Sequence, residues 1–429
     1  VAARGVAQAA RALLGLVALA ALAFFGYTGY LFFVPAKGPA TVQPSLEPAV
    51  GFPGSEGLQQ VLDASSAELE GVGLQATLIL PDGRMWTGVA GRAHHESGQP
   101  MTPAHLLHVG SVTKIYTAAL VMDLAVQGLL GLDDPVTRWI DLPQAEAVTV
   151  RMLLNHTSGL PSYTEDGLFL FRWFGQPWKR WEPPELIAVI RNRPLKFPPG
   201  SRHEYSNTNY LLLGLILEAV TGQPYGQLVQ ELAGRLGLKA TFALTYPDRL
   251  PVATGYDQSL FRLGRRNMAR FRIAMETGAH AAGAVLATSH DVARFLHALM
   301  TGQLLPLGAV AAMQAFVAAP DEDVPAQQGY GLGLRQLVVA GQPLVGHTGT
   351  IVGYSAVAVH HAEKGYTLVI LSNLSVIDQL GLVAKMQAAI DRLPVPPEAE
   401  TSTVKAPAEG EFGAGTDRGT LEGVPLRRL

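Results

Sequence analysis

The order of strand and helix patterns along this chain limits the folds that it can adopt. Apolar runs typical of strands lie near both ends, at residues 74–80, 85–89, 331–339, 344–346, 353–360 and 366–372. Between about 105 and 325 the patterns are mostly helical with long loops, and two more helices are expected at 55–69 and 375–393. This order predicts an α+β fold (an α/β sandwich), in which an antiparallel sheet built from both chain ends is flanked by helices and carries an inserted, mostly helical lobe.

The first 35 residues contain an apolar segment of the kind that anchors a chain in a membrane or directs its export. Residues 12–34 form a run of 23 residues without a charge, long enough to cross a bilayer as a helix. Arg4 and Arg11 precede the run, which favours a cytoplasmic N-terminus. The alternative is a cleaved signal peptide with Ala21-Leu22-Ala23 as its small-residue site, but the apolar run continues past that site and favours a single-pass anchor. In both cases the remainder of the chain is expected outside the cytoplasm.

Composition divides the rest of the chain. Residues 36–53 hold several Pro and Gly and predict a linker, residues 54–393 form the main domain, and residues 394–429 are predicted to be disordered. The chain has no cysteine, which excludes disulfides and thiolate zinc sites. Its net charge of −3 gives no indication of a nucleic-acid partner. No pattern defines the oligomeric state.

Ser111-Val112-Thr113-Lys114 is the most informative motif. From Val112 onward the apolar residues recur with helical spacing, so Ser111 begins a helix and Lys114 follows one turn later on the same side. A hydroxyl is a poor nucleophile until a base removes its proton, and a lysine can be that base when burial and a helix N-terminus lower its pKa. The spacing therefore predicts a Ser-Lys nucleophile. A second match, Ser402 to Lys405, lies among prolines and is interpreted as a coincidence.

Two further motifs follow in the chain. Tyr205-Ser206-Asn207 precedes a long apolar helix pattern and offers a second base and a donor to a substrate. His347-Thr348-Gly349-Thr350 comes just before a strand pattern, and its glycine lets a substrate backbone approach that strand. Each short motif alone often occurs by chance. Their order and spacing together indicate one active site.

With these motifs the chain resembles the penicillin-recognising serine hydrolases, on the class C β-lactamase side. The resemblance covers roughly residues 54–392 and includes further segments that match in type and order, at 132–136, 152–160, 282–292 and 330–334. Tyr205 stands where the class A motif set has a serine, as in class C enzymes. His347 replaces the family's lysine, as in many esterase- and peptidase-like relatives. A titrating histidine in place of a permanent cation argues against efficient β-lactam hydrolysis.

The resemblance implies a mechanism for Ser111. This residue attacks a carbonyl and forms an acyl-enzyme, while Lys114 and Tyr205 share the general-base role in an order that the sequence leaves open. The backbone N–H groups of Ser111 and Thr350 are implied as donors to the oxyanion. No cofactor and no metal are expected.

The resemblance also implies residues that bind the substrate. Asn207 is expected to bind a substrate amide or carbonyl, together with Thr348, Gly349 and Thr350. His347 is expected to steady the Tyr205 side of the site and the polar end of the substrate. The predicted protein is a serine hydrolase acting on a small-molecule or peptide acyl substrate, namely an ester, a D-amino-acid peptide or a β-lactam. The alternative is a non-catalytic relative that binds cell-wall peptide or acts as an envelope scaffold.

Other segments have competing interpretations. The aromatic and cationic run at 168–181 is predicted mainly to pack the helical lobe, with a cleft wall or a membrane-dipping patch as alternatives. The arginine-rich run at 262–272 is predicted to be a solvated loop, with an anionic substrate or a lipid headgroup as the alternative. His94-His95 and His360-His361 are predicted as surface turns, because adjacent strand side chains point to opposite faces and seldom chelate a metal.

Overall fold

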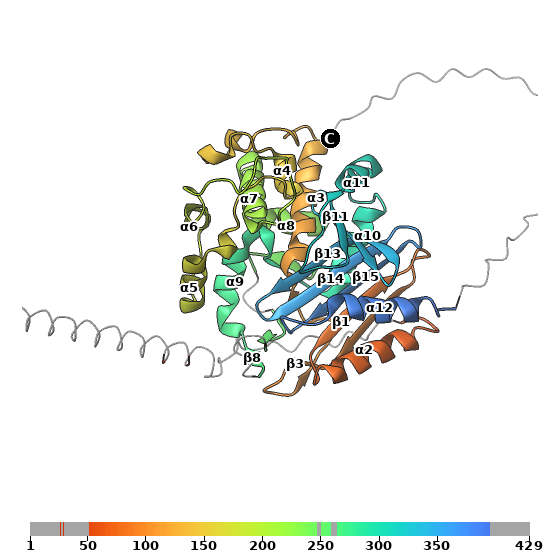
Figure 1. Cartoon of the computed structure of the whole chain (residues 1–429). Coiled ribbons are helices and arrows are strands. Elements are labelled where there is room, and N and C mark those ends of the chain that lie inside the picture. Colours follow the sequence, from red (N-terminus) through yellow and green to blue (C-terminus); the bar gives the residue numbers. More distant parts are fainter. Residues whose placement is uncertain (1–25, 27–28, 30–50, 247–249, 259–263, 395–429) are drawn as a thin grey trace, which may run out of the picture. The chain divides into compact units, whose positions relative to one another are not determined.

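A computed structural model describes residues 51–246, 250–258 and 264–394, together with Gly26 and Gly29 (Figure 1). The predicted anchor at 12–34, apart from those two glycines, most of the predicted linker and the predicted disordered segment from 395 onward lie outside the described residues. Among the residues that are described, no helix combines the length and the apolar character needed to cross a bilayer.

The described chain contains one large antiparallel sheet built from both chain ends, as predicted. The strand order is β10-β11-β12-β13-β14-β15-β1-β2. Strand β1 near the N-terminus pairs with β15 near the C-terminus, and Leu74 of β1 lies opposite Ser372 on one side and Ala90 on the other. The strands are β1 (Leu74–Ile79), β2 (Met85–Ala90), β10 (Val317–Ala318), β11 (Gln327–Tyr330), β12 (Arg335–Val339), β13 (Gln342–Ile351), β14 (Tyr354–His361) and β15 (Tyr366–Ser372).

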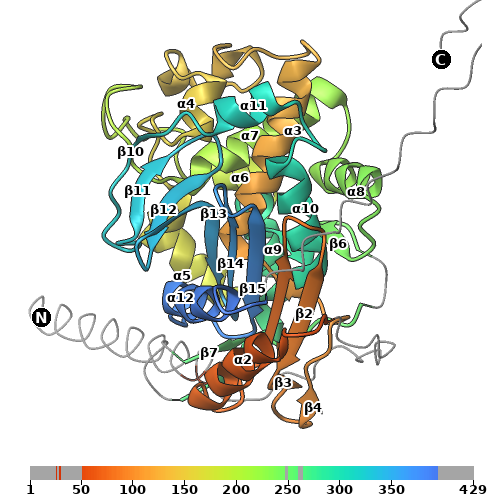
Figure 2. The same cartoon turned by 90° about the vertical axis from the view of Figure 1, so that its right-hand side faces the viewer.

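Helices cover both faces of this sheet (Figures 1 and 2). Helices α2 (Glu56–Glu68) and α12 (Gln379–Ile390) pack on one face, where Leu74 and Leu78 of β1 join the same buried cluster as Leu58 of α2. Gln75 and Thr77 point to the other face, because strand side chains alternate. There Thr77 Oγ1 lies 2.9 Å from Ser289 Oγ, at the start of helix α10 (Ser289–Met300). The predicted sandwich is thus confirmed at the level of its layers.

The helical lobe lies between the two sets of strands in sequence. Helix α3 (Thr113–Val126) runs through its centre, and every residue from Thr113 to Met122 is buried. A helix that is apolar on most sides is stable only when it is surrounded by other elements. Around α3 the lobe contributes α4 (Val150–Leu154), α5 (Gly167–Gly175), α6 (Pro183–Ala188), α7 (Asn207–Thr221), α8 (Tyr225–Arg235), α9 (Arg272–Ala279) and α11 (Leu307–Met313).

Short strands also occur in this part of the chain, where mostly helices were predicted. The three-stranded sheet β5-β9-β6 leads directly to Ser111. Its strands are β5 (Leu107–His108), β6 (Thr241–Ala243) and β9 (Val285–Ala287). Also in this part, β7 (Tyr256–Asp257) pairs with β8 (Arg266–Asn267), and ahead of it β3 (Arg92–His94) pairs with β4 (Gln99–Pro100). Strands this short contain too few residues for an alternating pattern to be recognised.

Three predicted boundaries were wrong in the C-terminal part. The strand predicted at 331–339 begins only at Arg335, because residues 331–334 form a tight turn, with Gly333 at a φ of +79°, that separates β11 from β12. The strand predicted at 344–346 is the ten-residue β13, which includes the whole His347–Thr350 motif. The terminal helix starts at Gln379 rather than at 375. Asp378 caps its start by accepting a hydrogen bond from Gly381 N at 2.8 Å.

The predictions for the histidine pairs and the arginine run also need correction. His360 and His361 lie within β14 and are buried, and His94 is buried in β3. Across the described ranges, no three His, Cys, Asp or Glu side chains are grouped so that they could hold a metal ion. In the arginine run, Arg265 donates to the carbonyl of Leu69 at 2.8 Å, and Arg272 pairs with Glu276 at 2.7 Å. Arg265 thus joins its loop to the end of α2, and Arg272 is paired within α9, so these two arginines are not part of a solvated loop. Arg262 lies outside the described residues.

Candidate active site

Two glycines bring the nucleophile segment against strand β13. A Cβ atom on Gly349 would lie 2.1 Å from the carbonyl oxygen of Val109, and one on Gly110 would lie 3.0 Å from the backbone nitrogen of Thr350. Gly110 also has a φ of +51°, which a side chain would strain. The space at Gly349 is therefore occupied by the nucleophile segment, whereas the sequence had suggested that it admits a substrate backbone. The contact places the backbones of Ser111 and Thr350 side by side.

Ser111 lies in a 3-10 turn (Gly110–Val112) that leads into α3. Its Oγ lies 3.1 Å from Lys114 Nζ and 2.9 Å from Tyr205 Oη. Lys114 reaches Ser111 because the two residues are one helical turn apart. Tyr205 comes from the segment just ahead of α7, which packs against α3. The structure thus brings both predicted bases to the predicted nucleophile.

Lys114 is fully buried, and no ion pair to it is found among the described residues. Its Nζ lies 2.9 Å from Asn207 Oδ1 and 2.7 Å from the carbonyl oxygen of Ala282. Burial, helped by the nearby guanidinium of Arg335, holds the pKa of Lys114 well below its ordinary value. Such an amine is largely neutral at pH values where an exposed lysine is charged.

Tyr205 is half-buried and has the Lys114 amine and the Arg335 guanidinium near its ring. Lys114 Nζ lies 4.9 Å and Arg335 Cζ lies 5.3 Å from the ring centroid. Burial raises the pKa of Tyr205, while Arg335 and the hydrogen bond to Ser111 lower it less strongly. The phenol is therefore protonated at neutral pH, and its O–H is available to donate to Ser111 Oγ.

His347 lies beside Tyr205 but is buried. The side chain is fully buried, and its Nε2 lies 2.9 Å from Tyr330 Oη, while its Nδ1 faces the carbonyl oxygen of Thr348. Burial, together with Arg335 and Lys114, holds the pKa of His347 well below its ordinary value. The imidazole lies behind the Tyr330 hydroxyl, so the predicted contact of His347 with the polar end of a substrate stays a prediction. As predicted, His347 lies on the Tyr205 side of the site, and the centroids of the His347 and Tyr205 rings are 6.3 Å apart.

Three residues near the site were missed by the sequence analysis. The His156 ring centroid lies 4.3 Å from that of Tyr205, and its Nδ1 accepts a hydrogen bond from Ser206 N at 3.2 Å. Tyr330 places its hydroxyl against His347 Nε2. Arg335 on β12 forms an ion pair with Asp321, with 3.2 Å between Nη1 and Oδ2. His156 and Tyr330 lie in the segments 152–160 and 330–334 that carried the family resemblance, which was a usable signal. Arg335 belongs to an ordinary strand pattern, and no signal in the sequence pointed to its place near the site.

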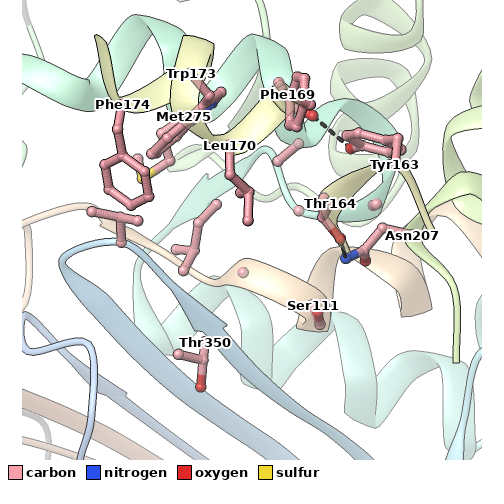
Figure 3. A pocket seen from close by; sticks show the side chains of 17 residues that line it. Ser111, Tyr163, Thr164, Phe169, Leu170, Trp173, Phe174, Asn207, Met275 and Thr350 are labelled. Carbon is pink, nitrogen blue, oxygen red and sulfur yellow. Dashed lines mark hydrogen bonds between the residues drawn. The ribbon is translucent and has the colours of Figure 1, made fainter. Parts of the chain in front are cut away.

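An apolar pocket of about 220 Å³ opens next to Ser111 (Figure 3). Phe169, Leu170, Trp173 and Phe174 of α5 form one wall. Phe169, Trp173 and Trp181 also belong to the buried core of the lobe, so the aromatic run both packs the lobe, as mainly predicted, and lines a cleft. Asn207 and Thr350 lie near Ser111, and Asn207 Nδ2 donates to Thr164 Oγ1 at 3.0 Å. The other lining residues are Gly110, Tyr163, Thr164, Met275, Gly278, Ala279, Ala282, Gly283, Ile351 and Val352.

A second pocket of about 560 Å³ meets the first at Ser111 and is polar. Thr348, Thr350 and Arg335 line it together with Tyr205. Its carboxylates are those of Glu165, Glu204, Asp321, Glu322 and Asp323. Ser111 thus lies between an apolar pocket made mainly by helices and a polar pocket at the edge of the large sheet. This arrangement suits a nucleophile that splits an acyl compound into an apolar and a polar part.

Comparisons with known proteins agree with this site. Penicillin-binding protein 4* of Bacillus subtilis (strain 168) is 27% identical over 298 residues, covering 65% of each chain. Esterase EstB of Burkholderia gladioli is 32% identical over 217 residues, covering 46% of this chain and 53% of the esterase. The matches thus span between about half and two thirds of these curated relatives. The D-amino acid amidase of Ochrobactrum anthropi SV3, complexed with L-phenylalanine, superimposes with a TM-score of 0.71 at 28% identity, covering 79% of this chain and 99% of the amidase.

The family model named Beta-lactamase matches residues 58–390, which is most of the chain and almost all of its described part. The matched range includes Ser111, Lys114, Tyr205 and both pockets. The relatives include penicillin-binding proteins, an esterase, a β-lactamase and amidases, which are all variants of one hydrolase fold. The chain belongs to the β-lactamase family of serine hydrolases.

Proposed function

We propose that this protein hydrolyses an ester or amide with a bulky apolar acyl group, through an acyl-enzyme on Ser111. The observation that carries the proposal is the position of Ser111 Oγ, within hydrogen-bonding distance of both Lys114 Nζ and Tyr205 Oη and at the edge of the apolar pocket. A nucleophile flanked by a base and a proton donor is the arrangement that covalent acyl transfer requires.

Lys114 is the first base in this proposal. A neutral amine has two N–H donors and one lone pair. Two neighbours of Lys114 Nζ, Asn207 Oδ1 and the carbonyl of Ala282, are acceptors only, so they take the two hydrogens. The lone pair then faces Ser111 Oγ and accepts the serine proton as the oxygen attacks the substrate carbonyl carbon. The lowered pKa of Lys114 keeps the lone pair available near neutral pH.

Tyr205 handles the second proton transfer. Its phenol donates to the leaving oxygen or nitrogen as the tetrahedral intermediate collapses, and Lys114 returns a proton to the phenolate. A water then attacks the acyl-enzyme, with the same two groups taking its proton and giving one to Ser111 Oγ. The oxyanion of each intermediate is held by the adjacent backbones of Ser111 and Thr350, a type of donor whose loss typically costs about 10²–10³ in rate.

The two pockets support the choice of substrate. The wall formed by α5 is aromatic and aliphatic, which fits a phenyl-sized or longer acyl substituent. The related amidase occurs in complex with L-phenylalanine amide, and another relative is an esterase. The leaving group would lie over the polar pocket. The buried, neutral His347 offers no cation for the carboxylate of a β-lactam, so we expect β-lactams to be poorer substrates than esters and amides.

We further propose that this reaction takes place outside the cytoplasm, with the chain held at the membrane by residues 12–34. The support is the uncharged run of 23 residues and the arginines that precede it. No feature of the geometry favours the alternative of a non-catalytic binding or scaffold protein, since nucleophile, bases and pocket are all in place.

The test is a panel of p-nitrophenyl esters, which share one leaving group, together with two amides. Rates of p-nitrophenyl acetate, hexanoate and phenylacetate hydrolysis, and of D- and L-phenylalanine amide hydrolysis, would be compared for the wild-type chain and Ser111→Ala. The proposal expects kcat/KM to rise with the size of the apolar acyl group and to vanish in the variant. Retention of activity in Ser111→Ala would refute the role of Ser111. A preference for the acetyl donor would refute the substrate class while leaving the nucleophile intact.

A further inference from the structure

Helix α5 is apolar on both of its sides. Its sequence is Gly-Leu-Phe-Leu-Phe-Arg-Trp-Phe-Gly, and only Phe169 and Trp173 of its large residues are buried. The opposite side exposes Leu168 and Phe171, with 69% and 55% of their surfaces accessible. A helix that is apolar all round is normally buried in a core or in a membrane. Phe169 and Trp173 pack into the core, and Leu170 and Phe174 line the substrate pocket with them.

The exposed side of α5 continues onto neighbouring segments. Trp178, which follows the helix, is 60% exposed, and Ile273 at the start of α9 is 43% exposed. The segments that carry these two residues lie side by side, because Ala274 N donates to the carbonyl oxygen of Pro177 at 3.4 Å. Leu168, Phe171, Trp178 and Ile273 are called the α5 patch below. Four large apolar side chains are thus exposed on α5 and on the segments that pack next to it, and exposed apolar residues that cluster mark interaction sites.

The surroundings of the α5 patch are moderately basic. Arg172 and Arg180 are exposed beside it, and Lys179 lies with its Nζ 4.5 Å from the Trp181 ring centroid. Asp166 is paired with Arg193, and Glu185 is paired with Lys179, so these four charges cancel. The charges that remain are those of Arg172 and Arg180 against that of Glu182. The polar pocket on the far side of Ser111 carries five carboxylates instead. Charge therefore favours an anionic surface at α5 and disfavours one at the polar pocket.

We propose that the α5 patch inserts into the headgroup region of a bilayer containing anionic lipid. Aromatic and leucine side chains enter such an interface while flanking arginines remain among the lipid phosphates. Leu170 and Phe174, which are half-buried on the pocket side of the same helix, then lie between the bilayer and Ser111. An acyl donor dissolved in the membrane reaches the nucleophile along α5 without crossing water. Docking and turnover are separate properties, so this inference does not depend on the proposed reaction.

The absence of cysteine makes a direct test possible in the full chain. Phe171→Cys carries a nitroxide label in the patch. Leu307→Cys is the matched control, because Leu307 is 64% exposed on α11, which lies far from α5 (Figures 1 and 2). Each protein is reconstituted into vesicles of phosphatidylcholine with and without phosphatidylglycerol. The collision rates of the label with oxygen, which concentrates in lipid, and with a nickel chelate, which stays in water, are then measured by electron paramagnetic resonance.

The expected result is a several-fold rise in the oxygen-to-nickel collision ratio at position 171 in the anionic vesicles, with no change at 307. An equally water-accessible label at both positions in all vesicles would overturn the proposal. So would a label at 171 that is already shielded from both reagents without vesicles, because another part of the chain or a second copy would then cover the patch.

The charges are tested by Arg172→Glu combined with Arg180→Glu in the labelled chain. The collision ratio at position 171 should fall back toward its value in water in anionic vesicles. Hydrolysis of a water-soluble ester should stay unchanged, which shows that the fold is intact. Total vesicle binding is not the readout, because residues 12–34 alone could supply it. Unchanged insertion in the double variant would overturn the electrostatic part of the proposal.

Discussion

The two pockets that meet at Ser111 differ in origin as well as in polarity. The apolar pocket is walled by α5 and α9 of the inserted lobe, whereas the polar pocket is bordered by β12, β13 and the loop around Asp321 at the edge of the large sheet. The nucleophile and its bases lie on the boundary between them. The difference implies that acyl-group preference and proton chemistry depend on separate parts of the molecule. Substitutions in each part should therefore change different kinetic parameters.

The largest effect is expected at the boundary itself. Ser111→Ala removes the nucleophile and should lower kcat/KM by about 10⁴-fold or more, as loss of a nucleophile does in other serine hydrolases. The measurement is steady-state hydrolysis of an apolar acyl ester. Ser355→Ala is the control, because Ser355 lies buried in β14 with its Oγ donating to the carbonyl of Leu374 at 2.8 Å. If both variants lose activity equally, the loss reflects folding rather than chemistry.

Lys114→Met keeps the length of the buried side chain and removes the base. We expect kcat to fall by about 10²–10⁴-fold, the usual contribution of general acid–base catalysis. In the wild type the rate should rise as pH increases through the pKa of Lys114, because only the neutral amine accepts the serine proton. Since burial lowers that pKa, the rise should be complete well below the pH at which an exposed lysine titrates. A rate that keeps rising into that alkaline range would contradict a neutral Lys114.

A smaller and selective effect is expected in the apolar pocket. Leu170→Ala should lower kcat/KM for phenylacetyl or hexanoyl donors by about 10-fold, and acetyl donors should be nearly unaffected, because only the larger groups reach this wall. Leu168→Ala is the matched control, since the same residue type on the same helix is exposed to solvent. Equal losses for all acyl donors would mean that the acyl group does not bind along α5.

The smallest effect is expected in the polar pocket. Arg335 lowers the pKa of Lys114 and of Tyr205, so Arg335→Met should raise both pKa values and move the acid limb of the pH–rate profile to higher pH. The change in rate at the plateau should be only a few-fold, because Arg335 does not contact Ser111. Arg202→Met serves as control, since Arg202 pairs with Glu204 and is mostly exposed. An unmoved acid limb would show that Arg335 does not act on these groups.

Parts of the fold could be predicted because local patterns carry them. The β1–β2 hairpin and β15 were predicted to within a residue or two, since strands of six or seven residues rich in apolar side chains have a clear beginning and end. The β11–β12 pair was missed because its turn, Gly331 to Leu334, reads as a continuous apolar run. The buried histidines of β14 were mistaken for a turn, because a polar residue in a strand shows its burial only through its partners, such as Thr367 for His360 at 2.9 Å.

The sequence by itself determined the Ser111–Lys114 pair, because two residues one helical turn apart must be neighbours whatever surrounds the helix. It also determined that strands from both chain ends enclose a helical lobe. Only the tertiary structure decided that Tyr205, 94 residues away, touches Ser111, that His347 is buried, and that one side of α5 walls the pocket. Those outcomes depend on how distant segments pack, and local periodicity contains no information on which apolar face meets which.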